Sequence, residues 1–228
     1  MLSENKIEEQ LKLFAKYGDE IITSCRWVRF KDKPNEINII RQNIDKDYAN
    51  TIEWLIDSWS GKGVGQTGIW LVPRKILVKA GKWNEQLLKN QDGEFFCRVI
   101  LQSNKIIFSK NTLAYYRDTR NSITNKFNYE AAFNTLLSYD LYIQHLSKYL
   151  DQKKVKLALA SNFSSFYAYV YPFYPDLLIV AEKRIKELGF KNFPLTGGRK
   201  FKVLSAVFGV KKATFIRRKL SLKHKMQK

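Results

Sequence analysis

The amino-acid sequence predicts an α/β fold in the first half of the chain and an α-helical region in the second half. Up to about residue 125, runs rich in β-branched and aromatic residues alternate with segments of helical periodicity. From Phe127 onward every segment has the apolar spacing of a helix. Hydrophobic residues make up 45% of the 228 residues, far more than a disordered chain carries. We therefore expect a folded protein.

The chain is expected to begin with an amphipathic helix over 3–17, ended by Gly18. A strand follows over 21–30, because this run is rich in β-branched and aromatic residues. The apolar side of the first helix carries Ile7, Leu11 and Phe14.

A later helix is delimited by Pro73 at its start and Gly81 after its end, the usual positions of these residues. The other elements expected in the first half are an irregular segment over 35–47, a helix over 48–59, a glycine-rich loop over 60–68, short strands over 69–72, 105–108 and 112–116, and a buried helix over 91–101.

The second half is expected to be helical throughout. Its helices are predicted over 127–150, 153–171 and 175–188, followed by a basic amphipathic stretch after Gly197 and Gly198. This pattern predicts three regions, namely an α/β domain over 1–125, a helical appendage over 126–198 and a basic amphipathic tail over 199–228.

Basic residues are concentrated at the end of the sequence. There are 40 Lys and Arg against 21 Asp and Glu, and eleven of the basic residues but none of the acidic ones lie in 199–228. This composition is typical of a helix that lies on an anionic membrane surface. Nucleic acid is not an expected partner, because the charge is not spread over the chain and no RRM, KH or helix-turn-helix signature is present. The apolar residues of the tail are Phe201, Leu204, Val207, Phe208, Phe215 and Ile216.

Cysteine and histidine usage argues against several classes of site. Two cysteines, Cys25 and Cys97, make neither a disulfide framework nor a zinc cluster and favour a reducing compartment. The two histidines lack a second ligand at metal spacing. The first residues lack the apolar core of a signal peptide, and the apolar window 163–181 is interrupted by serine, proline and aspartate. We expect a cytoplasmic protein, with peripheral attachment to the inner face of the membrane as a further expectation.

Two short motifs match binding signatures in their letters but not in their context. The segment 63–68 matches G-x-G-x-x-G, but a strand before it and a helix after it are missing. We interpret it as a flexible glycine loop near a binding cleft. The pair Asp45 and Asp47 is formally a D-x-D that can hold Mg²⁺ or Mn²⁺. No buried strand leads into it, so a solvated loop with Asp47 as a helix N-cap is the favoured interpretation.

The strongest chemical signal is the segment 91–98. It places Asp92 and Glu94 at the start of an apolar helix, directly after a loop that contains Trp83. Two interpretations of Asp92 stay open. It is either a catalytic carboxylate or a residue that caps the helix and favours its dipole.

Several stretches together resemble the second half of the family 2 glycosyltransferases. They are 68–77, 80–85 and 91–101, followed by 115–117 and Ser122. In that family the third stretch has Glu-Asp and then an apolar helix with an Arg. Here Gln91 stands in place of the Glu, whereas Asp92 and Arg98 match. Residues 2–10 resemble the helix that follows the family's metal-binding aspartates, and Pro194, Gly197, Gly198 and 209–213 resemble the tail of one subgroup.

The resemblance implies a GT-A fold, of which 1–125 is the acceptor-side part with a partial sheet. It implies inverting transfer of a sugar from a nucleotide-sugar donor to a glycan or lipid-linked acceptor, as in the synthesis of cell-envelope polysaccharides. Asp92 is then the base, and Glu94 is the reserve candidate. The implied substrate-binding residues are Trp70, Trp83, Arg98 and Arg117. Core packing is the alternative for both tryptophans, and a surface salt bridge is the alternative for Arg117.

The resemblance also implies Mg²⁺ or Mn²⁺ in the full-length enzyme, held by aspartates that these residues do not include. We therefore expect no metal site in this chain, and no transferase activity from it alone. The alternative function is that of a non-catalytic basic protein, derived from such a domain, that binds a membrane or nucleic acid.

Overall fold

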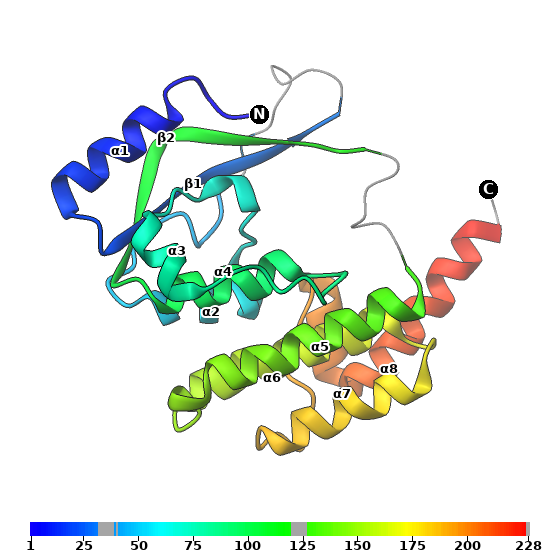
Figure 1. The fold of residues 1–228 in the computed structure, drawn as a ribbon. Coiled ribbons are helices and arrows are strands. Elements are labelled where there is room, and N and C mark those ends of the chain that lie inside the picture. Colours follow the sequence, from blue (N-terminus) through cyan, green and yellow to red (C-terminus); the bar gives the residue numbers. More distant parts are fainter. Residues whose placement is uncertain (32–38, 40, 120–126, 227–228) are drawn as a thin grey trace. The chain divides into compact units, whose positions relative to one another are not determined.

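The structure, a computed structural model, describes residues 1–31, 39, 41–119 and 127–226, and side chains as far as 220. The chain divides into two units (Figure 1). Unit 1 comprises 1–58 and 62–127, and unit 2 comprises 59–61 and 128–228. Ser122, the boundary expected near Asn125, and residues 35–38 and 40 of the irregular segment expected over 35–47 lie outside the described residues.

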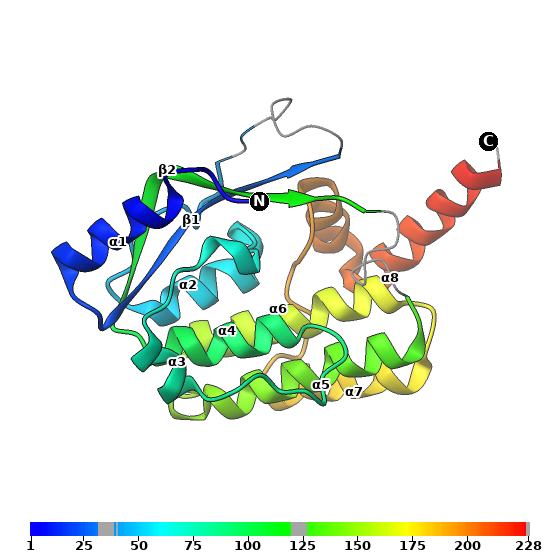
Figure 2. The same ribbon diagram turned by 45° about the horizontal axis from the view of Figure 1, so that its top comes forward.

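Unit 1 is built around two parallel strands, β1 (Ile21–Phe30) and β2 (Lys105–Arg117). Cys25 pairs with Ser109 and Arg26 with Leu113, so β2 bulges between them. The first five residues of β1 are all buried, as in a parallel strand that is covered on both faces. In Figures 1 and 2, α1 (Lys6–Tyr17) lies on one side of the strands, whereas α2 (Thr51–Asp57), α3 (Arg74–Ala80) and α4 (Gln91–Leu101) lie on the other.

Capping residues and glycine set the ends of helices α2 and α3 in unit 1. Asn50 caps α2 by accepting a hydrogen bond from the amide of Ile52 (3.2 Å). Gly81, with φ 80°, ends α3, and its amide donates to Leu77. Helix α4 spans the expected residues and packs against α2 and α3. The core that they share with the strands includes the fully buried side chains of Ile22, Ile76, Val99, Ile100 and Ile106.

The first helix does not bury the side that its apolar pattern indicates, but one rotated by about 100° from it. Lys6 and Gln10 are buried, whereas Ile7 and Leu11 are exposed. The reason lies in the residues before the helix. The amide of Ser3 donates to the carbonyl of Leu113 (2.9 Å), and Leu2 pairs with Ala114 in antiparallel fashion. These bonds fix the helix start against β2, and the polar side then faces the sheet.

Three further expectations are corrected. The helix expected over 48–59 is α2 alone, followed by a π-type turn over Ser58–Lys62 in which Gly61 has φ 78°. The strand expected over 69–72 is a short 3₁₀ helix, Thr67–Ile69, followed by a single bridge between Leu71 and Thr23. The strands expected over 105–108 and 112–116 are one strand, because the bulge absorbs the break in the apolar pattern.

Unit 2 is helical among its described residues. It contains α5 (Tyr129–His145), a 3₁₀ turn over Ser147–Tyr149, α6 (Lys153–Val170), α7 (Pro175–Glu187) and α8 (Arg199–Met226). Helix α6 is the central one and packs against α5, α7 and α8. Its most deeply buried side chains include Val155, Leu159 and Phe163. The described fold is therefore mixed α/β, mostly helical, with a two-stranded parallel sheet and a helical C-terminal region.

Helix α8 is kinked at Gly209, where φ is 76°. Before the kink, Phe201 packs in a cluster with Ala168 of α6. After the kink, Arg217 donates to the carbonyl of Ala168, and its guanidinium lies 4.3 Å from the centre of the Phe201 ring. No helix in the described part of the chain is both long and apolar enough to cross a membrane.

Candidate functional site

The carboxylate of Asp92 lies exposed in the first turn of α4. The N-cap position belongs to Asn90, which has left-handed backbone geometry (φ 60°), so Asp92 is not the cap residue. Its Oδ1 accepts a hydrogen bond from the amide of Gly93 (2.9 Å). The positive end of the helix dipole favours a negative charge at this position. Asp92 is therefore an exposed carboxylate at the start of α4.

Two residues that sequence reasoning did not single out lie beside Asp92. The hydroxyl of Thr67 donates to Oδ2 of Asp92 at 3.4 Å. Lys89 is partly buried, which lowers the pKa of its ammonium group, and the charge of Asp92 opposes that shift. The signal for Thr67 was its place in the glycine-rich loop, where Gln66 accepts a hydrogen bond from the amide of Gly68 (2.6 Å) and so forms the turn.

Glu94 has a different environment from Asp92, although only one residue separates them. Its carboxylate is buried and accepts two hydrogen bonds from Arg98, from Nε at 2.7 Å and from Nη2 at 2.9 Å. Arg98 also donates to the carbonyls of Ala80 and Lys82. The pair therefore ties α4 to the end of α3 and to the loop that carries Trp83. Within this geometry both side chains hold the protein together.

The two tryptophans assigned to substrate binding differ in exposure. Trp70 is buried, and its ring stacks on Phe96 (5.6 Å between centres). Trp83 is 42% exposed and stacks on Phe95 at 4.5 Å with the rings nearly parallel. Trp70 thus packs in the core, whereas Trp83 offers part of an aromatic surface near the start of α4. An exposed indole of this kind suits the apolar face of a sugar.

Arg117 lies exposed at the end of β2. Its guanidinium lies over the ring of Phe30, 5.6 Å from the centre. This contact joins the ends of the two strands. Among the described residues, the ring contact found for Arg117 is with Phe30 and not with Asp92.

The carboxylates of the D-x-D pair are engaged by the protein itself. Asp45 accepts hydrogen bonds from Arg26 (3.2 Å) and from the amide of Gln42 (3.0 Å), whereas Lys46 and Asp47 beside it are exposed. Asp47 accepts from the amide of Phe108 (2.7 Å) and is not the N-cap of α2. Among the described residues, no three His, Cys, Asp or Glu side chains gather as a metal site requires.

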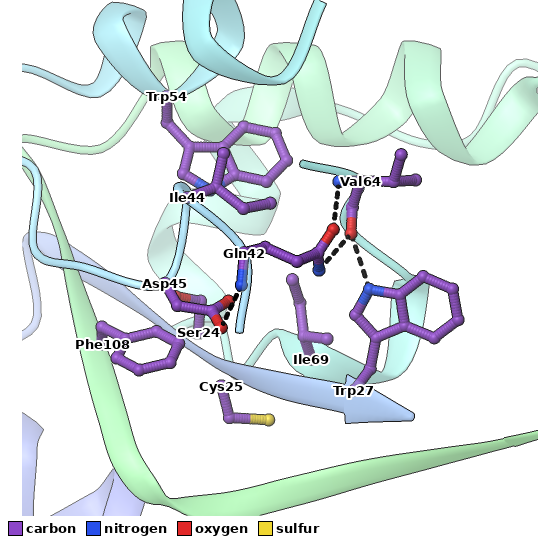
Figure 3. Close-up of a pocket in the computed structure, with 10 residues that line it drawn as sticks. All are labelled: Ser24, Cys25, Trp27, Gln42, Ile44, Asp45, Trp54, Val64, Ile69 and Phe108. Atoms are coloured by element: carbon purple, nitrogen blue, oxygen red, sulfur yellow. Dashed lines mark hydrogen bonds between the residues drawn. The ribbon is translucent and has the colours of Figure 1, made fainter. Parts of the chain in front are cut away.

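The glycine-rich loop borders a small hollow beside β1 (Figure 3). The carbonyl of Val64 accepts hydrogen bonds from the indole of Trp27 (2.6 Å) and from Gln42 (3.2 Å). A Cβ atom at Gly65 would lie 2.9 Å from the Trp54 ring, so only glycine allows the loop to pack there. The loop therefore packs against Trp54 and bonds to Trp27 and Gln42, and Gln42 in turn bonds to Asp45.

Cys25 at the base of the hollow is not a nucleophile. Burial raises the pKa of its thiol to about 11, so the thiol stays protonated at neutral pH. Comparison with known proteins finds no matching family model, no significantly similar curated protein and no matching solved structure.

Proposed function

We propose that the chain is the acceptor-side part of an inverting, family 2-like glycosyltransferase with a partial GT-A sheet. In this proposal a sugar passes from a nucleotide-sugar donor to a glycan or lipid-linked acceptor. The observation that carries the proposal is the contrast on α4. Asp92 is exposed beside Thr67, whereas Glu94 is buried against Arg98.

Inverting transfer is a single displacement. The acceptor oxygen bonds to the anomeric carbon while the bond from that carbon to the diphosphate oxygen breaks, and the acceptor proton moves to a carboxylate. Asp92 has the exposure that this role needs. Thr67 orients one of its oxygens through the hydrogen bond to Oδ2, and Lys89 interacts with its charge. Trp83 is the surface on which the acceptor sugar stacks, whereas Glu94 and Arg98 hold its loop in place.

The donor and the metal require residues that these 228 do not contain. In the family, aspartates hold the Mg²⁺ or Mn²⁺ that supplies positive charge to the leaving diphosphate. The described carboxylates of this chain do not fit such a metal, and we assign no step to it. The exposed apolar side of α1 supports a donor-side partner. Ile7 and Leu11 would be buried by a further layer on that helix.

The test compares two carboxylate variants in a protein in which the donor-side half is restored. Asp92→Asn should lower turnover by roughly 10²–10⁴-fold, the range for loss of a general base, with donor affinity unchanged. Glu85→Gln, at an exposed carboxylate in the Trp83 loop, is the matched control and should retain turnover. Turnover of the Asp92 variant within a few-fold of the parent would rule out the assigned base.

A second proposal concerns residues 199–228, which we propose bind an anionic membrane surface at the inner face of the membrane. Every charged residue in this stretch is basic, and Val203, Val207 and Phe208 are exposed on α8. Binding to anionic vesicles and to RNA at matched salt separates a membrane partner from a nucleic acid. Preference for RNA would favour the alternative, a basic nucleic-acid-binding protein.

A further inference from the structure

One end of unit 2 exposes aromatic side chains at the turn between α6 and α7. Tyr169 is 54% exposed and Phe173 is 49% exposed. Next to them, Tyr174 has left-handed backbone geometry and its ring lies edge-on to that of Tyr129 (5.3 Å between centres). The end of α6 and the turn before α7 therefore carry partly exposed aromatic side chains.

The second half of α8 lies at the same end. Arg218 donates to the carbonyls of Tyr171 (2.9 Å) and Tyr169, which are among the groups left without partners where α6 ends. Figures 1 and 2 both show this part of α8 beside the α6–α7 turn. The arginine is thus a capping residue for α6, and it fixes α8 against the aromatic turn.

The same stretch of α8 exposes further apolar and basic groups. Phe215 is 45% exposed, and the ammonium of Lys219 lies 4.7 Å from its ring centre. Phe215 precedes Arg218 by three residues and Lys219 by four, so the three share a helix face. Leu220 is exposed as well. We name the residues at this end of α6 and on the adjoining face of α8 the aromatic–basic end, consisting of Tyr169, Phe173, Phe215 and Lys219.

We propose that the aromatic–basic end inserts into the headgroup region of an anionic lipid bilayer. The inference rests on the proposed membrane binding of residues 199–228 and adds the α6–α7 turn as the inserting element. Tyrosine and phenylalanine beside lysine are the side chains that lie at membrane interfaces, where apolar rings are buried and charged heads stay in water.

Charge and composition favour a bilayer over other partners. Two carboxylates lie near this end, and Asp176 is engaged because it accepts a hydrogen bond from the hydroxyl of Tyr129 (2.6 Å). Glu130, in the first turn of α5, is the other. The eleven basic residues of 199–228 outnumber them. Nucleic acids stack on aromatic rings but gain little from aliphatic side chains such as Leu220, Val203 and Val207, which are exposed on the same helix.

The test measures sedimentation of the full chain with vesicles of phosphatidylserine and phosphatidylcholine in equal amounts. The double variant Tyr169→Ser/Phe173→Ser should weaken partitioning by about tenfold or more, because it removes two inserted rings. Leu157→Ser is the matched control. It changes an exposed apolar residue of the same helix about 18 Å away along the axis and should bind as the parent does.

A charge variant separates this inference from the proposal on which it rests. The triple variant Lys200→Gln/Lys202→Gln/Lys212→Gln, which leaves the aromatic–basic end unchanged, should weaken binding on the order of a hundredfold. If it does so while the aromatic variant binds as the parent does, the tail proposal stands and the inserting turn is refuted. If neither variant changes binding, both are refuted.

A second measurement, the fluorescence of a label at position 173, reports insertion directly and not through a loss of binding. Cys25 and Cys97 are buried, so a Phe173→Cys variant can be labelled with a polarity-sensitive fluorophore. Vesicles should raise the emission of the label at position 173. They should leave unchanged the emission of the same label attached to a Leu157→Cys variant. Unchanged emission at 173 on sedimenting protein would overturn the inference. A competition result would also overturn the inference. In it, single-stranded RNA abolishes vesicle binding, and the Tyr169→Ser/Phe173→Ser variant binds that RNA more weakly than the parent does.

Discussion

Asp92 and Glu94 lie in the same helical turn, yet Asp92 is exposed and Glu94 is buried. The positive end of the helix dipole favours a carboxylate at the position of Asp92. A buried one is stable only with a partner, and Arg98 is that partner. Replacing Glu94 therefore tests stability before it tests chemistry, and turnover data for such a variant need an unfolding curve beside them.

Removal of the Glu94 carboxylate should destabilise unit 1. Glu94→Ala leaves the guanidinium of Arg98, whose side chain is only 17% exposed, without its counter-ion. We expect the free energy of unfolding to fall by about 2–4 kcal/mol in urea titrations. Glu85→Ala, at an exposed carboxylate of the Trp83 loop, is the control and should change the midpoint little. Equal midpoints for the two variants would show that the pair contributes nothing.

Asp57 should make the stability of unit 1 depend on acid. Its burial would raise the pKa of the carboxyl, but hydrogen bonds from Lys62, Lys46 and Tyr48 outweigh burial and lower it. A lowered pKa in the folded state gives stability that is present above the unfolded pKa of about 4 and is lost as the pH falls through the folded value.

Asp57→Asn should therefore be less stable than the parent at neutral pH, and the difference should shrink in urea titrations below about pH 4. Tyr48→Phe removes one of the three donors and should show a smaller effect of the same sign. A difference between parent and Asp57→Asn that stays constant across this range would contradict the expectation.

At the scale of elements, sequence patterns predicted the positions of most helices and strands. They did not predict which strands pair or which side of a helix is buried. Strand β1 and helix α4 have the predicted bounds, because apolar content and glycine or proline punctuation act locally. The pairing of β1 with β2, and the bulge that merges two expected strands, depend on contacts between segments far apart in the chain. Thr67 likewise meets Asp92 across 25 residues, which no local pattern encodes.

Helix α1 shows why the apolar pattern does not predict the rotation of a helix about its axis. Its hydrophobic side predicts the buried face only if the helix can turn freely about its axis, whereas the bonds of Met1 and Ser3 to β2 fix the rotation. Buried Gln10 then accepts from Lys6 (2.5 Å) and donates to the carbonyl of Ile69 (3.2 Å). Burial lowers the pKa of Lys6.

Two substitutions on α1 test this rotated orientation. Gln10→Ala should lower the free energy of unfolding of this chain by about 1–3 kcal/mol, because it leaves buried polar groups unpaired. Leu11→Ser, on the exposed apolar side, should change it little. The reverse ranking in thermal or urea unfolding would show that the apolar side is the buried one. In the protein with the donor-side half restored, Leu11→Ser should become destabilising as well.

At the scale of the whole molecule, the candidate site residues and the excess of basic residues lie in different parts of the sequence. Asp92 and its neighbours belong to unit 1, and the residues that bear the basic excess of 199–228 belong to unit 2. Within unit 2 some of this charge is already used. Lys211 pairs with Glu182 (2.6 Å), and Arg217 and Arg218 bond to α6 carbonyls. In the proposed membrane binding, the remaining lysines of the tail supply the attraction to anionic surfaces.

This separation predicts how the isolated chain meets a nucleotide sugar. UDP- and GDP-sugars should bind weakly or not at all in calorimetry, and Mn²⁺ should not strengthen binding, because the described carboxylates form no metal site. Heat from non-specific attraction of the diphosphate to the basic tail is expected at low salt and should disappear at high salt. Micromolar, Mn²⁺-dependent binding that persists at high salt would contradict the assignment of this chain to the acceptor side. Joining the donor-side half should restore such binding, and Asp92→Asn should leave it intact, since that carboxylate acts on the acceptor hydroxyl and not on the nucleotide.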